Sequence, residues 1–134
     1  MSALAIRAAL QVALAAITPS VAIAWENEPY KPVVGTPYQR VNLLFATPDN
    51  SEIGPNYVEH GFLQVTLAYP IDGGAQLAAG RADLLRSTFK RGFTFVYGGV
   101  TVLIEKTAQL WPAQIDGDRY SLPVRIPFRA SVTA

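Results

Sequence analysis

A run of alternating side chains near the end of the chain, residues 119–130, constrains the fold more than any other feature. Each odd-numbered position holds arginine, serine or proline, and each even-numbered position is apolar. The apolar positions are Tyr120, Leu122, Val124, Ile126, Phe128 and Ala130. A period of two predicts a strand with one buried face and one exposed face. Because Pro123 and Pro127 on the exposed side cannot donate ladder hydrogen bonds, we expect this strand at a sheet edge.

Arginines form a stripe on the exposed side of the same strand, at Arg119, Arg125 and Arg129, with no acidic residue from Arg119 onward. An edge strand with such a stripe is protected from accidental pairing and is available to a chosen partner. The stripe is either a solvated edge or a functional surface, namely a row of ion pairs between subunits or a surface facing DNA. Trp111 lies in a predicted loop, where it either covers its own core or anchors an interface. The pattern favours assembly over catalysis.

Length and composition limit the class of protein. The 134 residues fit a single domain, 1–134, which can bury roughly two-thirds of its unfolded surface. The absence of cysteine excludes disulfides and thiolate chemistry, and a formal net charge of +1 excludes a whole-protein electrostatic footprint for nucleic acid. Half of the residues are hydrophobic and only 16% are charged, a balance that favours an oligomer in which apolar surface is hidden.

The first segment, residues 2–18, predicts an amphipathic helix that packs on something. Its apolar face holds Ile6, Leu10, Leu14 and Ile17. Its polar face holds Arg7, Gln11 and Thr18. The alternative is a signal peptide, because residues 8–17 are apolar and Ala22-Ile23-Ala24 resembles a small-x-small cleavage site. No stretch is long and apolar enough to span a membrane.

The remaining elements follow from turn residues and periodicity. We expect a short extended piece at 21–25, a proline-rich connector at 26–37, and loops at 47–56 and 110–118. Strands are expected at 38–46, 57–69, 93–97 and 100–108, with a tight turn at Gly98-Gly99 between the last two. A second helix is expected at 75–90, with an apolar stripe of Ala78, Ala82, Leu85 and Phe89. This order predicts an α+β fold, an antiparallel-rich mixed β-sheet packed with two main helices in a single compact domain.

Catalytic and metal-binding patterns are weak. His60 is the one histidine and has no orienting partner in the sequence, so a surface role is favoured over a general base. Asp116 and Asp118 flank Gly117, and this pattern fits a turn better than a calcium loop. The glycine pairs match neither a P-loop nor a dinucleotide fingerprint. We therefore expect no catalytic residue, no metal site and no cofactor.

Several segments together resemble a known family. They are residues 25–32 (Trp-Glu-Asn-Glu-Pro-Tyr-Lys-Pro), 38–41, 61–70 and 122–128, with Gly73-Gly74, Ala82-Asp83, Phe89 and Gly92 between them. In this order they resemble a phage and prophage family of small proteins, which is similar to the tail terminator proteins of long-tailed phages, the lambda-like tail completion group. The resemblance extends over nearly the whole chain.

The resemblance implies an α+β protein that assembles as a hexameric ring. It would be in the host cytoplasm during assembly and in the tail of the virion, at the head–tail junction. The ring would cap the tail tube protein, stop further addition of tube subunits and offer its other face to the head–tail connector or stopper protein. DNA would pass through the lumen without specific binding, and no membrane would be involved. The loop at 47–56, with Asp49, Asn50 and Ser51 at its tip, suits a contact arm. Because a basic lumen would slow DNA, we place the arginine stripe at subunit contacts.

Two alternatives stay open at this point. One keeps the virion and makes the chain a head–tail connector, a stopper or a tube-like protein. The other follows from the signal-peptide interpretation and makes it a secreted bacterial small-ligand binder or a minor enzyme.

Overall fold

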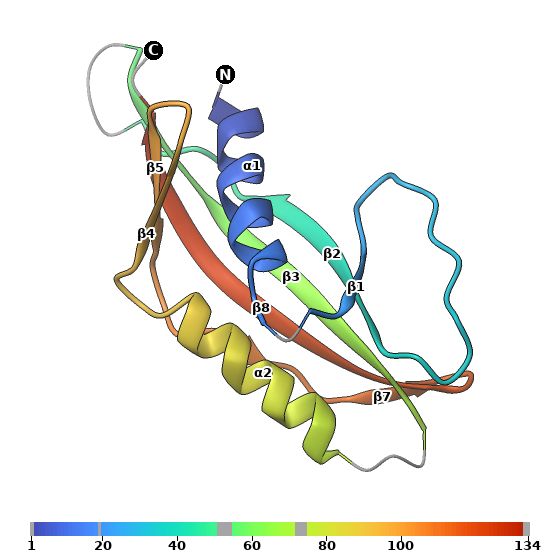
Figure 1. Cartoon of the computed structure of the whole chain (residues 1–134). Helices are drawn as coiled ribbons and strands as arrows, with labels where there is room; N and C mark the ends of the chain where they lie inside the picture. Colours follow the sequence, from blue (N-terminus) through green and yellow to red (C-terminus); the bar gives the residue numbers. More distant parts are fainter. Residues whose placement is uncertain (1, 19, 51–54, 72–74, 133–134) are drawn as a thin grey trace.

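Two helices lie on one face of a curved, mostly antiparallel sheet (Figure 1). The computed structural model describes residues 2–18, 20–50, 55–71 and 75–132. The elements are α1 (Ser2–Ala15), β1 (Ala22–Ala24), β2 (Tyr38–Phe45), β3 (Tyr57–Pro70), α2 (Gln76–Thr88), β4 (Thr94–Tyr97), β5 (Val100–Ile104), β6 (Gln109–Leu110), β7 (Gln114–Asp116) and β8 (Arg119–Val132). The strand order is β1-β2-β3-β8-β5-β4, and β6 and β7 also pair with β8. The predicted α+β class is confirmed.

The core lies between the helices and the inner face of the sheet. The apolar face that the sequence predicts for α1 is confirmed, since Ile6, Leu10, Leu14 and Ile17 are all buried. The predicted stripe of α2 is buried as well, at Ala78, Ala82, Leu85 and Phe89. From the sheet, the core receives the even-numbered residues 122–130 of β8 and the odd-numbered residues 63–69 of β3. Val41 and Leu43 of β2 and Val102 and Ile104 of β5 join the same cluster.

The position of β8 corrects one prediction, because this strand lies inside the sheet and not at its edge. On one side it pairs with β3 along its whole length, from Tyr57 opposite Val132 to Pro70 opposite Arg119. On the other side it pairs in turn with β5, β6 and β7. The segment 110–118, predicted as a loop, therefore contributes strand residues to the sheet.

The two prolines of β8 are tolerated because of where their missing amide hydrogens would point. The carbonyls of Pro127 and Pro123 accept hydrogen bonds from the amides of Glu105 (3.0 Å) and Trp111 (2.9 Å), so both prolines face the β5–β6 side. The neighbouring strands end at these places, β5 just before Glu105 and β6 just before Trp111. Proline thus divides the partner strand into short pieces and leaves the β3 side intact.

Among the strands that the structure describes, the free edges of the sheet are β4 at one end and β1 with the second half of β2 at the other. The β4–β5 hairpin has the predicted tight turn, in which Gly98 (φ 58°) and Gly99 (φ 79°) both have the left-handed backbone of a two-residue hairpin. In Figure 1, β4 and the connector that follows β1 lie on opposite sides of the sheet.

Gly61 of β3 lets β2 and β8 approach this strand closely. It lies between Phe45 of β2 and Phe128 of β8, whose rings meet edge to face across it at a centroid distance of 6.0 Å. A Cβ atom at Gly61 would stand 2.0 Å from the carbonyl oxygen of Leu44, which is part of the backbone and cannot move aside.

We therefore expect Gly61→Ala to lower the free energy of unfolding by about 3 kcal/mol, since the clash is with backbone. Gly80 is the matched control, because it lies within α2 and a Cβ there would meet nothing within 4 Å beyond its neighbours and the backbone of its own helix. Gly80→Ala should raise the free energy of unfolding by about 0.5–1 kcal/mol through helix propensity. Urea denaturation of the two variants should show effects of opposite sign, and equal effects would contradict the close approach at Gly61.

Candidate functional site

The outer face of the sheet, which no helix covers, holds the three arginines that the sequence places on one strand face. Arg119, Arg125 and Arg129 all occupy odd-numbered positions of β8, opposite to the positions that enter the core. The prediction that they share a face is confirmed. Their surroundings differ strongly, which the alternating pattern could not indicate.

Arg119 is buried and holds the proline-rich connector against the sheet. Only 6% of the residue is exposed. Its two terminal nitrogens donate to the carbonyl oxygens of Thr36 and, at 2.6 Å, of Val33. Its guanidinium also lies over the Tyr38 ring, with its carbon 5.1 Å from the ring centroid. These contacts give Arg119 a structural role within the monomer.

Arg125 lies between two aromatic rings at the centre of the outer face. Its guanidinium carbon is 4.1 Å from the centroid of Trp111 and 4.6 Å from that of Phe62. Its Nε donates to Oε1 of Gln64 at 3.1 Å, which fixes the plane of the guanidinium. Trp111 remains 39% exposed, so its indole covers Arg125 and also faces solvent. This arrangement is a rigid, amphipathic surface of the kind that anchors protein contacts.

Arg129 is the most exposed of the three arginines. It lines a shallow pocket of about 390 Å³ with Thr94, Thr101, Leu103 and Ser131. Within the ranges that the structure describes, no ion pair involves Arg129. It is therefore the member of the stripe that is best placed to contact another molecule.

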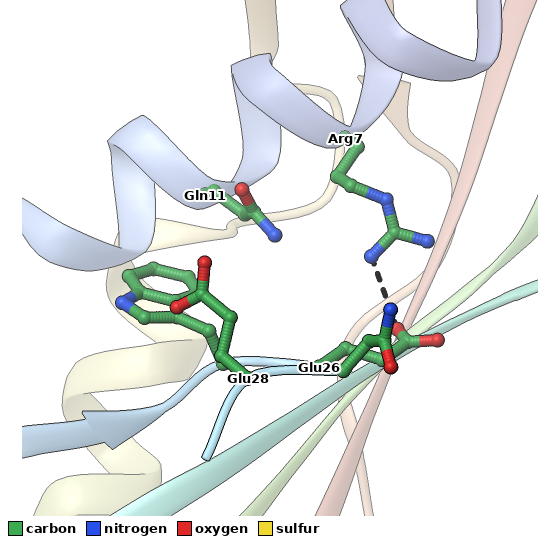
Figure 2. Close-up of a pocket in the computed structure, with 6 residues that line it drawn as sticks. Arg7, Gln11, Glu26 and Glu28 are labelled. Atoms are coloured by element: carbon green, nitrogen blue, oxygen red, sulfur yellow. Dashed lines mark hydrogen bonds and ion pairs between the residues drawn. The ribbon is translucent and has the colours of Figure 1, made fainter. Parts of the chain in front are cut away.

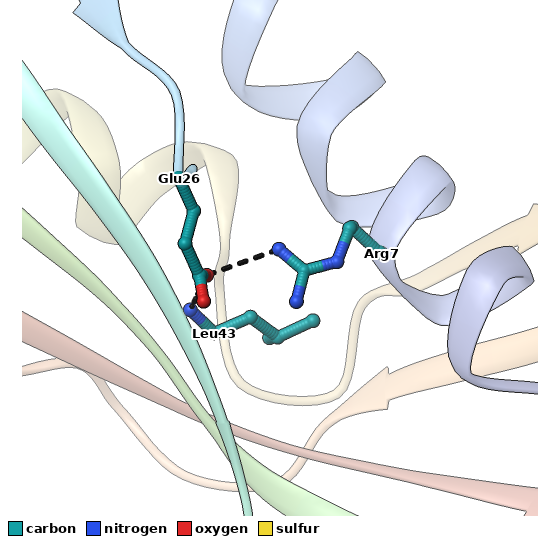
Figure 3. A network of polar contacts seen from close by, with 3 residues as sticks. All are labelled: Arg7, Glu26 and Leu43. Atoms are coloured by element: carbon teal, nitrogen blue, oxygen red, sulfur yellow. Dashed lines mark hydrogen bonds and ion pairs between the residues drawn. The ribbon is translucent and has the colours of Figure 1, made fainter. Parts of the chain in front are cut away.

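A second polar site joins the connector to α1 and to the free edge of β2 (Figure 3). Oε1 of Glu26 accepts hydrogen bonds from Nη1 of Arg7 at 3.0 Å and from the backbone amide of Leu43 at 2.9 Å. The pKa of the Glu26 carboxyl is lowered, chiefly by the Leu43 amide and also by Arg7, while burial acts in the opposite direction. The Glu26 carboxylate thus accepts from the Leu43 amide, which lies beyond the end of the pairing between β1 and β2.

A pocket of about 720 Å³ opens beside this junction, between α1 and the start of the connector. Its lining residues are Arg7, Gln11, Trp25, Glu26, Asn27 and Glu28. In Figure 2, Arg7 and Gln11 of α1 face Glu26 and Glu28 of the connector. The sequence reasoning did not predict this pocket. The unusual density of polar residues after Trp25 was the available signal, but the pocket also needs the packing of α1, which only the fold supplies.

The other predicted positions are less informative. Asp49 and Asn50 are exposed. The amide of Asp49 donates to the carbonyl of Val58, and the amide of Val58 donates to the carbonyl of Asp49, at 2.9 Å each. Ser51 lies outside the described residues. Asp116 and Asp118 flank the turn at Gly117 (φ 60°), as expected of a hairpin turn.

Across the described ranges, no three His, Cys, Asp or Glu side chains gather closely enough to hold a metal ion. As far as those ranges go, neither helix has the length and apolar character to cross a membrane.

We expect the two ends of the arginine stripe to respond differently to truncation. Arg119→Ala should lower the free energy of unfolding by about 2 kcal/mol, because charge-assisted hydrogen bonds to two carbonyls are lost. Arg129→Ala, on the same strand face, should change it by less than about 0.5 kcal/mol, since the side chain is exposed. Urea titrations of both variants measure this difference. A stability loss in Arg129→Ala that matches the loss in Arg119→Ala would contradict the assignment.

The Glu26 junction predicts a pH dependence of stability. Because the carboxyl pKa is lowered by folding, the ionised form stabilises the protein above the ordinary pKa of about 4.3, and this contribution is lost as the pH falls through the lowered value. Glu26→Gln should therefore be less stable than the wild type at pH 7, and the gap should close toward pH 3. Glu28→Gln is the control, with an effect below about 0.5 kcal/mol. Thermal unfolding across this range would refute the prediction if the gap stayed constant.

Comparison with known proteins shows which family this chain belongs to. Five chains of solved structures match it; one is 23% identical, with a TM-score of 0.79 and an alignment that covers 100% of this chain and 99% of that one. At this identity the likeness to the solved structure concerns the fold alone. No curated protein matches the sequence. The family described as phage tail terminator protein matches residues 5–128. The chain therefore belongs to the phage tail terminator family, a structural and non-enzymatic family, and it is a structural protein of the phage tail.

Proposed function

We propose that this chain forms a homo-oligomeric ring, with six subunits as the resemblance implies, that caps the tail tube and ends its polymerisation. The opposite face of the ring provides the docking surface for the head–tail connector, and DNA passes through the lumen without specific binding. Family membership over residues 5–128 supports the tail role. The observation that carries the ring is the presence of two free edges at opposite ends of one sheet.

The hydrogen-bonding groups at both edges are oriented for sheet extension. The carbonyl of Phe93 accepts from the amide of Ile104, so Thr94 and Val96 direct their amides and carbonyls away from β5. The amide of Ala46 donates to the carbonyl of His60, so by the same alternation Leu43 and Phe45 are directed away from β3. The Leu43 amide is already bonded to Glu26, which leaves the Leu43 carbonyl and Phe45 for a further strand. An unpaired strand edge is a template for another strand.

Apolar side chains accompany both edges. On the β4 side the exposed fractions are 48% for Phe93, 67% for Val96 and 49% for Tyr97. On the β2 side they are 43% for Leu44 and 39% for Phe45. Exposure of this apolar surface does not stabilise a monomer. Its burial in an assembly is favourable by about 25 cal/mol for each Å² removed from water.

Opposite edges of one sheet can pair only head to tail when the same contact repeats around the assembly. Such a heterologous contact produces a closed ring when the rotation between subunits divides a full turn. Ring closure multiplies weak individual contacts, because the last subunit binds through two interfaces at once.

Termination then follows from the two faces of the ring. One face matches the last ring of the tube, and the other lacks the surface on which tube subunits polymerise. We assign contacts with a neighbouring subunit or ring to Trp111, Arg125, Arg129 and the loop that carries Asp49, Asn50 and Ser51. Arg119 contributes indirectly, because it positions the connector.

The proposal is tested by adding purified protein to polymerising tail-tube subunits and imaging the tubes by negative-stain microscopy. We expect tubes capped at one end by an extra ring, with growth arrested. Val96→Pro should abolish capping without unfolding the monomer, because the Val96 amide points away from β5 and is needed only for sheet extension. Val96→Thr keeps that amide and should cap normally. Uncapped tubes that grow unhindered with the wild-type protein would contradict the terminator role and favour a connector that binds the portal.

A further inference from the structure

We propose that the 720 Å³ pocket between α1 and the connector receives the Arg91 side chain of a second copy of this chain, next to it in the ring. The inference rests on the proposed function and names the polar contact that would orient the head-to-tail interface. It assigns a role to the Trp-Glu-Asn-Glu segment, which the monomer uses only in part.

The pocket has the chemistry of a guanidinium receptor. Arg7 already compensates the charge of Glu26, with 3.0 Å between Nη1 and Oε1. Glu28 is exposed, and no ion pair joins it to any residue in the described ranges, so the lining carries one uncompensated negative charge. Trp25 is half-buried against the core and lines the same pocket. A carboxylate next to an indole suits a planar cation, which can stack on the ring and donate two hydrogen bonds.

Arg91 is displayed at the other end of the sheet. It lies in a turn between α2 and β4, in which the amide of Phe93 donates to the carbonyl of Lys90 at 2.9 Å. Gly92 has the left-handed backbone (φ 91°) that this turn requires, so Arg91 stands at its tip. Arg91 is exposed, and the described part of the chain offers it no ion pair. Its neighbour Lys90 is less available, since Nζ lies 6.0 Å from the centroid of the Phe93 ring.

The distribution of charge selects a second copy as the occupant. The pocket and its carboxylates lie beside β1, at one end of the strand order, and Arg91 with Lys90 lies beside β4, at the other end. In Figure 1, the start of the connector that follows β1 and the turn that leads into β4 lie toward opposite edges of the sheet. A head-to-tail contact therefore brings Glu28 of one copy toward Arg91 of the next, while an isologous contact of either end with itself leaves Glu28 and Arg91 on separate surfaces. The same contact brings the free β4 edge toward the free edge of β2.

Charge reversal with rescue tests the pairing. Glu28→Lys and Arg91→Glu should each weaken ring assembly at least tenfold, as measured by sedimentation velocity over a concentration series at low salt. The double variant should recover most of the wild-type assembly, because the opposite charges are restored in exchanged positions. Asp83→Lys, at an exposed position of α2, is the matched control and should assemble as the wild type does. Circular dichroism should show all four variants folded.

The outcomes separate the two proposals. A wild-type protein that stays monomeric at every concentration would overturn the ring and this contact with it. Wild-type rings that persist unchanged in Glu28→Lys and Arg91→Glu would overturn only the Arg91 contact. Loss of assembly in both single variants without recovery in the double variant would also overturn it, because the two charges would then act in separate places.

Discussion

The pairing of β3 with β8 supports every other feature of this molecule. The two strands are matched residue by residue from Tyr57 opposite Val132 to Pro70 opposite Arg119. Since side chains alternate along each strand, this single register sends one set of residues toward both helices and the other set to the outer face. A shift of one residue would exchange the two sets, so the core and the arginine surface depend on the same hydrogen-bond ladder.

Two charged side chains attach the irregular connector to this sheet. Arg119 holds it through carbonyl oxygens, and Glu26 holds it through the amide of Leu43 and the guanidinium of Arg7. Tyr30 adds a ring contact with Tyr38 at a centroid distance of 5.0 Å. Proline-rich segments cannot form ladder hydrogen bonds of their own, so side chains must supply the contacts that give the connector one position. That position shapes the pocket beside α1.

A structural protein carries its function on surfaces that look like defects in the monomer. Three features would be liabilities in a protein that acted alone. They are the exposed apolar residues next to β4 and β2, the unpaired strand edges and the low charge content. In the ring proposed above, these same features would form the contacts between subunits. The stacked Arg125 and Trp111 fit this view, because an anchor that is already rigid loses little entropy on binding.

The sequence alone determined the local periodicities and hence the buried faces, since a period of two or of 3.6 follows directly from strand and helix geometry. It therefore predicted both helices, the inner face of β8, the hairpin at Gly98-Gly99 and the shared face of the arginines. The tertiary structure alone decided which strands are neighbours. It placed β8 in the interior, because Pro123 and Pro127 face only the side where β5 and β6 end. It also decided which arginine is buried and where the connector forms a pocket, because these depend on contacts between residues far apart in the chain.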